Sequence, residues 1–242
     1  MYGFAGISAS LMAAAGLEGN RDIFGCQHGV LDAWGAPSRR QTELTDGLGA
    51  NFEIEGHNFK FINAGMPIHT PIEASLTLLR ENSIALEAIE KIEVGMTENP
   101  LRVVDNNPMH NICVQDMLAA SIVRDGLALH DMPFPTILDE PDYRKVRDRI
   151  SVSVDSQIQS EMPEARAARV TITTTDGQSH TQRIDHPRGH SRRGDVSWGD
   201  LYGKWQGNLF GCDVDSAFSA VQALEKVEDV QLLSKAFAGI MR

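Results

Sequence analysis

A lysine and a histidine lie in the run of this chain that is best suited to bind an anion: Lys60-Phe61-Ile62-Asn63-Ala64-Gly65-Met66-Pro67-Ile68-His69-Thr70-Pro71-Ile72. Apolar and polar residues partly alternate over residues 51–61, which predicts a strand before the junction. Thr70 suits an N-cap and Pro71 a first helical position, which predicts a helix after it. Free backbone N–H groups and the helix dipole attract anions at a helix start. We therefore expect Lys60 and His69 to bind an anionic group.

Each of these two residues also has a purely structural interpretation. A lysine at the end of a strand can extend its stem over apolar surface and keep its charge in water. A histidine near a helix start can pack beneath the preceding loop. The run alone does not decide between these alternatives.

The most basic stretch of the chain, residues 186–193, supplies a second group of cations. Arg192 and Arg193 could attract an anion, although a solvated loop is the favoured interpretation. His186 and His190 have the spacing of two metal ligands on a helix, but an intervening proline and glycine oppose a helix there. We therefore predict no metal site.

Other familiar chemical patterns are missing from the sequence. The three cysteines, Cys26, Cys113 and Cys212, are far apart and odd in number, so neither a disulfide framework nor a zinc ribbon fits. Cys113 has no cationic neighbour that would activate its thiol, and we expect it in the core. There is no phosphate-binding glycine loop, Ser/His/Asp order or nucleotide fingerprint. We therefore predict no cofactor and, from the cysteines, a reducing cytoplasmic location.

The composition limits the classes of partner. The chain has 242 residues, 42% hydrophobic and 23% charged, with a formal net charge of −11. This is typical of a globular protein and opposes general binding to nucleic acid or to an anionic membrane. No run approaches the roughly 18 apolar residues of a membrane span. The apolar start, residues 1–16, lacks the positive charge of a signal peptide and is interrupted by glycines.

The elements that must position these residues fall into three groups. Apolar spacing predicts short helices before Gly16 and over Asn20–Trp34, and two more segments at the end, Trp198–Trp205 and Asp213–Ile240 with a break near residues 227–229. Between them the pattern is mixed. It predicts strands at Lys91–Met96 and Ile150–Val154, helices from Ile72, over Ile112–Leu127 and over Asp142–Arg149, and a hairpin over Ala168–Ile184 with a tight Asp176-Gly177 turn.

This order predicts an α+β fold in which a mixed unit is inserted into a helical body. We expect a helical segment over residues 1–55, an α+β lid domain over 56–186 and a helical return segment over 187–242. The helical segments alone are too few for a sound core, so their all-α domain would be incomplete.

Four stretches in the same order resemble the carboxy-terminal half of the MmgE/PrpD family, which includes 2-methylcitrate dehydratase, cis-aconitate decarboxylase and iminodisuccinate epimerase. They are Gly6–Gly19, Lys60–Ile72, Ala119–Gly126 and Arg188–Lys204. The resemblance implies a lid domain with part of its supporting helices. Family members are much longer, and a histidine, an aspartate and a further lysine that complete their active site belong to the half that precedes this sequence. It therefore implies at most half of an active site here.

The resemblance also implies roles for individual residues. Enzymes of the family perform proton chemistry next to a carboxylate, without a redox cofactor, and need cations to hold that carboxylate. Lys60 matches a carboxylate clamp, His69 a residue that orients it or reaches the pocket, and Arg188 a position near the domain crossover. Gly65 and Met117 stand where the decarboxylase branch carries a histidine and a tyrosine. These two differences disfavour decarboxylation of cis-aconitate.

Two functions remain open from the sequence. The first is the lid-bearing half of a cofactor-independent lyase or isomerase of a small di- or tricarboxylate, with Lys60 and His69 as catalytic candidates and Lys60 and Arg188 as substrate-binding candidates. A homo- or hetero-oligomer built through the helical segments would supply the missing wall and the general base. The second is a non-catalytic remnant or assembly subunit that keeps the lid fold, which the substitutions at Gly65 and Met117 favour. A wrongly assigned start or a truncated chain is a further alternative.

Overall fold

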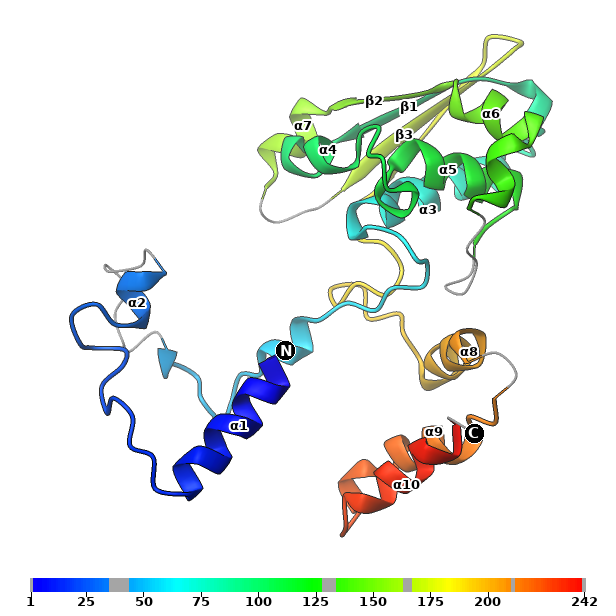
Figure 1. The fold of residues 1–242 in the computed structure, drawn as a ribbon. Coiled ribbons are helices and arrows are strands. Elements are labelled where there is room, and N and C mark those ends of the chain that lie inside the picture. Colours follow the sequence, from blue (N-terminus) through cyan, green and yellow to red (C-terminus); the bar gives the residue numbers. More distant parts are fainter. Residues whose placement is uncertain (1, 35–43, 128–133, 163–166, 210–211, 241–242) are drawn as a thin grey trace. The chain divides into compact units, whose positions relative to one another are not determined.

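The structure is a computed structural model that describes residues 2–34, 44–127, 134–162, 167–209 and 212–240. It comprises two compact units, Met1–Ile54 and Glu55–Arg242, each of which is described by itself. Figure 1 shows the elements of both units. Among the described residues, no helix has both the length and the apolar character that a membrane span requires.

The described residues of the first unit have little regular structure beyond one helix. It contains α1 (Tyr2–Ala14) and the short α2 (Val30–Ala33). The predicted helix over Asn20–Trp34 is therefore wrong for most of its length. Asn20 and Asp22 instead accept hydrogen bonds from the backbone N–H groups of Asp22 and Gly25, at 2.9 Å each, and these local bonds compete with a helix.

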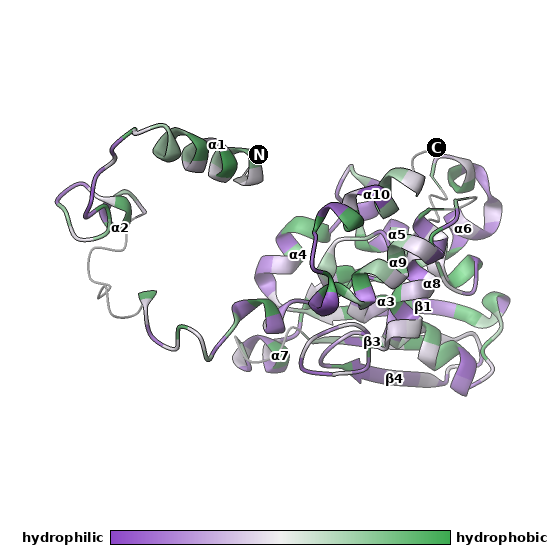
Figure 2. Cartoon of the chain, turned by 90° about the horizontal axis from the view of Figure 1, so that it is seen from below, coloured by the Kyte–Doolittle hydropathy of each residue, from purple (hydrophilic) through white to green (hydrophobic). Residues whose placement is uncertain are grey.

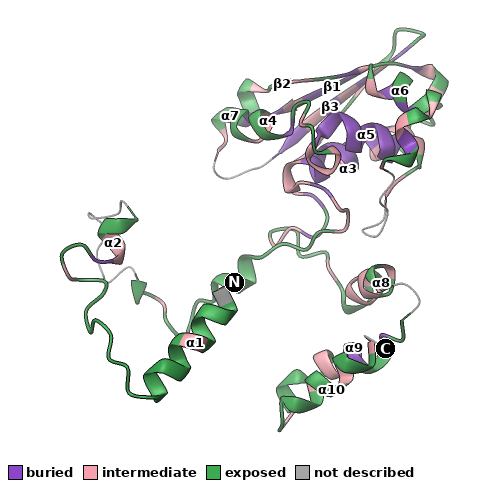
Figure 3. Ribbon diagram, viewed as in Figure 1, coloured by how far each residue is buried: buried purple, intermediate pink, exposed green. Residues whose placement is uncertain are grey.

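The helix α1 is apolar but exposed within its unit. Figure 2 shows it as mostly hydrophobic and Figure 3 shows it as mostly exposed. Phe4, Ile7 and Leu11 each leave about two thirds or more of their surface accessible, at 78%, 66% and 67%. The predicted helix before Gly16 is confirmed, but the apolar side chains are not buried by the described residues of this unit.

The second unit contains the sheet and most of the helices. Its helices are α3 (Met66–Glu81), α4 (Glu98–Val104), α5 (Val114–Val123), α6 (Pro141–Arg147), α7 (Ser156–Ser160), α8 (Trp198–Asn208), α9 (Asp215–Gln222) and α10 (Gln231–Ile240). Its strands are β1 (Ile89–Met96), β2 (Ile150–Val154), β3 (Ala168–Thr174) and β4 (Ser179–Ile184). Short 3-10 turns occur at Glu53–Gly56, Leu86–Ala88, His110–Ile112, Thr136–Asp139 and Leu224–Lys226. The predicted α+β fold is confirmed.

The four strands form one mixed sheet in the order β2-β1-β3-β4. β1 pairs parallel with β2 and antiparallel with β3, and β3 pairs antiparallel with β4. Residues of β3 alternate between buried and half-buried, because α3 covers one face of the sheet. On the other face, the hydroxyls of Thr171 and Thr181 lie 2.9 Å apart across the β3–β4 pair. The sheet therefore has one core face and one polar face.

The predicted hairpin is confirmed, but its turn differs from the expected one. Gly177 has φ +85°, whereas Asp176 keeps a negative φ, so the loop is longer than a two-residue turn. The Asp176 carboxylate accepts hydrogen bonds from the Thr174 hydroxyl at 2.5 Å and the Gln178 N–H at 3.2 Å. The aspartate stabilises the turn through its side chain rather than through an unusual backbone conformation.

The core lies between the sheet and a helical layer. α3 and α5 pack against each other, and residues 114–122 of α5 are all buried. A helix that is surrounded on all sides in this way must be apolar almost all round, which α5 is apart from a few polar residues. Cys113, at the start of this helix, is fully buried as expected, and burial raises the pKa of its thiol.

Two expectations near the lysine–histidine run are wrong. Residues 51–61 form no strand: Glu53–Gly56 is a 3-10 turn, and Phe59 makes a single backbone hydrogen bond to Gly189 instead of a ladder. α3 begins at Met66 with Gly65 as N-cap, so Pro71 lies inside the helix and Thr70 is not its cap. The Gly65 N–H donates to the Asn111 carbonyl at 2.9 Å, which fixes the earlier start.

Candidate functional site

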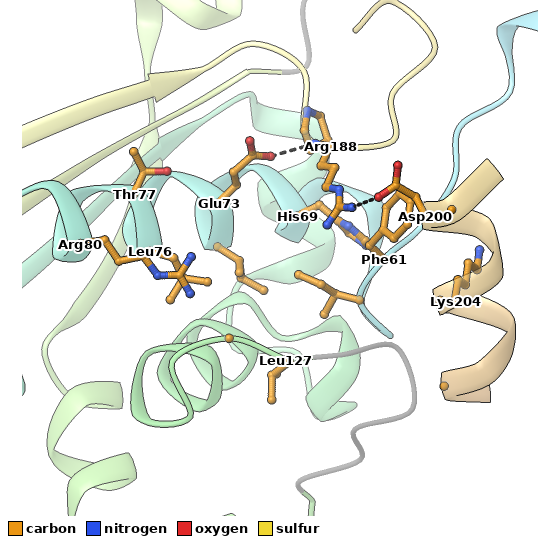
Figure 4. A pocket seen from close by; sticks show the side chains of 17 residues that line it. Phe61, His69, Glu73, Leu76, Thr77, Arg80, Leu127, Arg188, Asp200 and Lys204 are labelled. Carbon is orange, nitrogen blue, oxygen red and sulfur yellow. Dashed lines mark hydrogen bonds and ion pairs between the residues drawn. The ribbon is translucent and has the colours of Figure 1, made fainter. Parts of the chain in front are cut away.

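A cavity of about 690 Å³ lies beside α3 (Figure 4). His69, Ile72 and Leu76 line it from α3, at spacings that place them on one face of a helix. Lys204 lines it from α8 and Arg188 from the loop that precedes α8. Because α3 starts five residues earlier than expected, His69 belongs to this helical face and not to a loop.

The two segments that lead into α3 and away from the sheet contact each other beside the cavity. The Phe59 N–H donates to the Gly189 carbonyl at 2.8 Å, and the Ser191 N–H donates to Oδ1 of Asn58 at 2.9 Å. Gly189 has φ +85°, and a Cβ there would lie 2.2 Å from the Phe59 carbonyl oxygen. Only glycine therefore permits this crossing.

His69 is the most deeply buried polar residue of the cavity, with 3% of its surface exposed. Burial, and then the positive charge of Lys60, lower its pKa from 6.5 to about 4, although a hydrogen bond to the Ala64 carbonyl opposes this in part. The imidazole is therefore neutral at pH 7. Nε2 has no hydrogen-bond partner among the described residues, which leaves Nδ1 to face Ala64. Nε2 is thus a buried acceptor without a partner among the described residues.

Lys60 lies next to the cavity but does not line it. Its side chain is exposed, and Nζ donates to the Ala64 carbonyl at 3.0 Å, the same carbonyl that holds His69. Its charge lowers the pKa of both His69 and Lys204. The structure therefore brings the two sequence candidates together around one backbone oxygen.

Lys204 is a cation of this site that the sequence analysis did not assign to it. It lines the cavity, and burial first and Lys60 second lower its pKa. Its Nζ lies 5.8 Å from the centre of the Phe59 ring. The available signal was its place in the Arg188–Lys204 stretch, but a lysine on a short amphipathic helix looks like a solvent-exposed residue. Only the fold shows that it approaches Lys60.

Arg188 lines the cavity, but its charge is already neutralised. Its guanidinium forms an ion pair with Asp200 and lies 4.5 Å over the centre of the Phe61 ring. Its backbone N–H donates to Oε2 of Glu73 at 2.8 Å. Asp200 is also held by Ser197 in a capping box that starts α8, and hydrogen bonds from Ser197 and then from Arg188 keep its pKa low. Arg188 therefore links α3 to α8, because its backbone bonds to Glu73 of α3 and its guanidinium to Asp200 of α8 (Figure 4).

Arg193 of the basic loop is also paired with carboxylates. Arg193 forms ion pairs with Glu73 and with Asp195, the second at 2.6 Å. It is therefore not the freely solvated side chain that was favoured from the sequence. His186 and His190 stack with ring centres 4.4 Å apart. Among the described residues, no group of three or more His, Cys, Asp or Glu side chains is arranged to hold a metal ion.

The two positions that differ from the decarboxylase branch lie away from this cavity in the described structure. Gly65 is the N-cap of α3, where an added Cβ would meet the side chain of Ile68 at 3.6 Å. Met117 lies in the core with 2% of its surface exposed. Both residues serve packing at these positions.

The fold and the cavity thus define an α+β unit with a cationic recess beside its first helix. The family described as the MmgE/PrpD C-terminal domain matches residues 63–227, well over half of the chain, and the chain belongs to this family. The match includes His69, Arg188 and Lys204, and it begins just after Lys60. A comparison with curated proteins finds no match.

Proposed function

We propose that this chain is the lid-bearing part of a cofactor-independent lyase or isomerase that acts on a di- or tricarboxylate by proton chemistry next to a carboxylate. One observation carries the proposal. Lys204 lines the cavity with its Nζ 5.8 Å from the centre of the Phe59 ring, Phe59 directly precedes Lys60, and among the described residues neither lysine forms an ion pair with a carboxylate. Two cations held together without a counter-ion favour an anionic ligand.

The two lysines have a direct role in such chemistry. They hold a substrate carboxylate and spread the negative charge that develops when a proton leaves the neighbouring carbon. Arg188 is a weaker substrate ligand than expected, because Asp200 already neutralises it. It acts as a positioning residue that holds α8, and with it Lys204, beside α3.

His69 contributes a hydrogen bond rather than a charge. With a pKa of about 4 it is neutral at pH 7, and a base this weak removes a carbon-bound proton poorly. Its Nε2 is buried without a partner among the described residues, and we assign this acceptor to a substrate hydroxyl next to the bound carboxylate. The general base of the reaction then comes from outside this chain.

We also propose that the chain works in a homo- or hetero-oligomer that completes the site and covers its apolar helices. The exposed apolar side chains of α1 favour this assembly. They equally favour the second candidate function, a non-catalytic subunit that keeps the lid fold for assembly. A cytoplasmic location remains a prediction.

Carboxylate binding and turnover together test the proposal. We expect citrate and succinate to bind the purified chain in calorimetric titrations, and Lys60→Met and Lys204→Met each to weaken binding about tenfold, since one hydrogen bond to a charged group contributes about 1.5–3 kcal/mol. Lys91→Met is the matched control, because Lys91 is exposed and paired with Glu93 at 2.7 Å.

Turnover distinguishes the enzyme from the assembly subunit. The chain is co-expressed with a polypeptide that carries the amino-terminal helical half of a longer family member. A panel of citrate-like and succinate-like acids is then screened for turnover. Turnover that Lys60→Ala abolishes supports the enzyme. Unchanged turnover in Lys60→Ala, or binding that is insensitive to both lysines, contradicts the proposal.

A further inference from the structure

The cavity beside α3 extends well beyond its cationic end. His69 and Arg80 both line it, and they are eleven residues apart on one helix, which corresponds to roughly 16 Å at 1.5 Å per residue. Arg80 is already paired with Asp125, at 3.0 Å, so the far end lacks a free cation. Charge that awaits a ligand is therefore concentrated at one end of a long recess.

The middle of the cavity is apolar on the α3 side. Ile72 and Leu76 follow His69 on the same face of α3, and Leu127 lines the cavity after α5 (Figure 4). An apolar surface in a recess of this volume is typical of a ligand site with a few polar groups that fix the orientation.

The α8 side of the same cavity carries no side chains at three positions. Gly199, Gly203 and Gly207 all line it, and a spacing of four places them in one stripe along the helix. A Cβ at Gly203 would meet no heavy atom within 4 Å. Glycine is costly inside a helix, so the stripe keeps space open at the expense of helix stability.

The polar end of the cavity supplies a second observation. His69 lines the cavity with 3% of its surface exposed, and its Nε2 is buried without a hydrogen-bond partner among the described residues. Lys204 follows Gly203 directly on α8. The polar end and the open, apolar part thus belong to one continuous lining.

We propose that the cavity binds a di- or tricarboxylate that carries a hydrocarbon arm. The carboxylates lie at Lys60 and Lys204, and the arm lies between the apolar face of α3 and the glycine stripe of α8. This inference rests on the proposed carboxylate function and adds the arm, which sets the length and shape of the acid that fits.

Two probes with the same charged end test the inference. Succinate and 2-hexylsuccinate are titrated into the full chain by calorimetry. We expect hexylsuccinate to bind at least tenfold more tightly, because burial of each CH₂ group contributes favourably. Gly203→Leu places a side chain in the path of the arm, and we expect it to weaken hexylsuccinate at least tenfold and to leave succinate unchanged.

The controls separate this inference from the proposed function. Leucine stabilises a helix relative to glycine, so Gly203→Leu does not endanger α8, and Gly239→Leu on α10 makes the same exchange away from the cavity. Equal affinities for the two probes, or an arm insensitive to Gly203→Leu, overturn the inference while succinate binding still supports the carboxylate site. Failure of both probes to bind overturns both proposals.

Discussion

Two clusters of charge in the second unit differ in how fully they are paired. Asp116 on α5 is buried and bonded to three donors: His110 Nδ1 lies 2.6 Å from Oδ2, the Tyr143 hydroxyl donates to Oδ1 at 3.0 Å, and Arg147 Nε donates to Oδ1 at 2.5 Å. The cluster at the cavity has two lysines and a buried histidine, with no carboxylate bonded to either lysine among the described residues.

The pKa shifts express this difference. Burial alone would raise the pKa of Asp116, but hydrogen bonds from His110 and Arg147 outweigh it and lower the pKa. At the cavity, burial and neighbouring positive charge act together and lower the pKa of both His69 and Lys204. The first cluster stabilises its charges and the second destabilises them. Unfavourable charge of this kind is typical of functional sites, where a bound ligand compensates for the lost stability.

Removal of the Asp116 charge has the largest expected effect. Asp116→Asn leaves Arg147 without its counter-ion in a partly buried place, and we expect a loss of about 3 kcal/mol in the free energy of unfolding, measured with urea. Asp125→Asn is the matched control, because Asp125 pairs with Arg80 while 81% of its side chain is exposed. We expect less than about 1 kcal/mol there. Equal losses of unfolding free energy in the two variants would contradict the difference between the buried and the exposed ion pair.

A fall in pH should lower the free energy of unfolding through His69 of the second cluster. The pKa of His69 is about 4 in the folded chain and 6.5 when unfolded, so the unfolded state takes up the proton first as pH falls. The stability that neutral His69 contributes is complete above pH 6.5 and is lost between pH 6.5 and 4, by about 3 kcal/mol.

The variant His69→Gln lacks this titration. Urea unfolding of wild type and variant at several pH values between 4 and 7 gives the difference in their free energies of unfolding. We expect that difference to change by about 3 kcal/mol across this range, in the direction that favours the variant at low pH. Parallel curves would show that burial does not hold His69 neutral.

Local patterns predicted the elements whose partners are near in sequence. The alternation over residues 168–184 predicted the β3–β4 hairpin, and apolar spacing predicted α5 and β1, because periodicity reports burial directly. Residues 51–61 showed similar alternation but form no strand, since a strand needs a sheet edge that only the fold supplies. The start of α3 was placed at Thr70 because Pro71 suits a first turn, yet the contact of Gly65 with Asn111 extends the helix to Met66.

Part of the candidate site was visible in the sequence. Lys60, His69 and Arg188 were found by residue type and by resemblance, and the structure brings them to one region. Lys204 was not predicted. It comes near Lys60 only because two distant segments cross at Gly189, and residue spacing does not show this. The neutralisation of Arg188 by Asp200 has the same cause. Sequence patterns show which residues carry charge, and only the fold shows which charges lack a partner.

The smallest predicted effect is also the most direct test of that distinction. Burial and Lys60 disfavour the charged form of Lys204, so Lys204→Met removes a repulsion at pH 7, and we expect the free energy of unfolding to stay the same or to rise by up to about 0.5 kcal/mol. Thermal unfolding with Lys91→Met as control measures it, since Lys91 is paired with Glu93 and gains nothing from the exchange. A clear loss of stability in Lys204→Met would mean that Lys204 serves the fold. A gain that accompanies weaker carboxylate binding would mean that the repulsion is retained for the ligand.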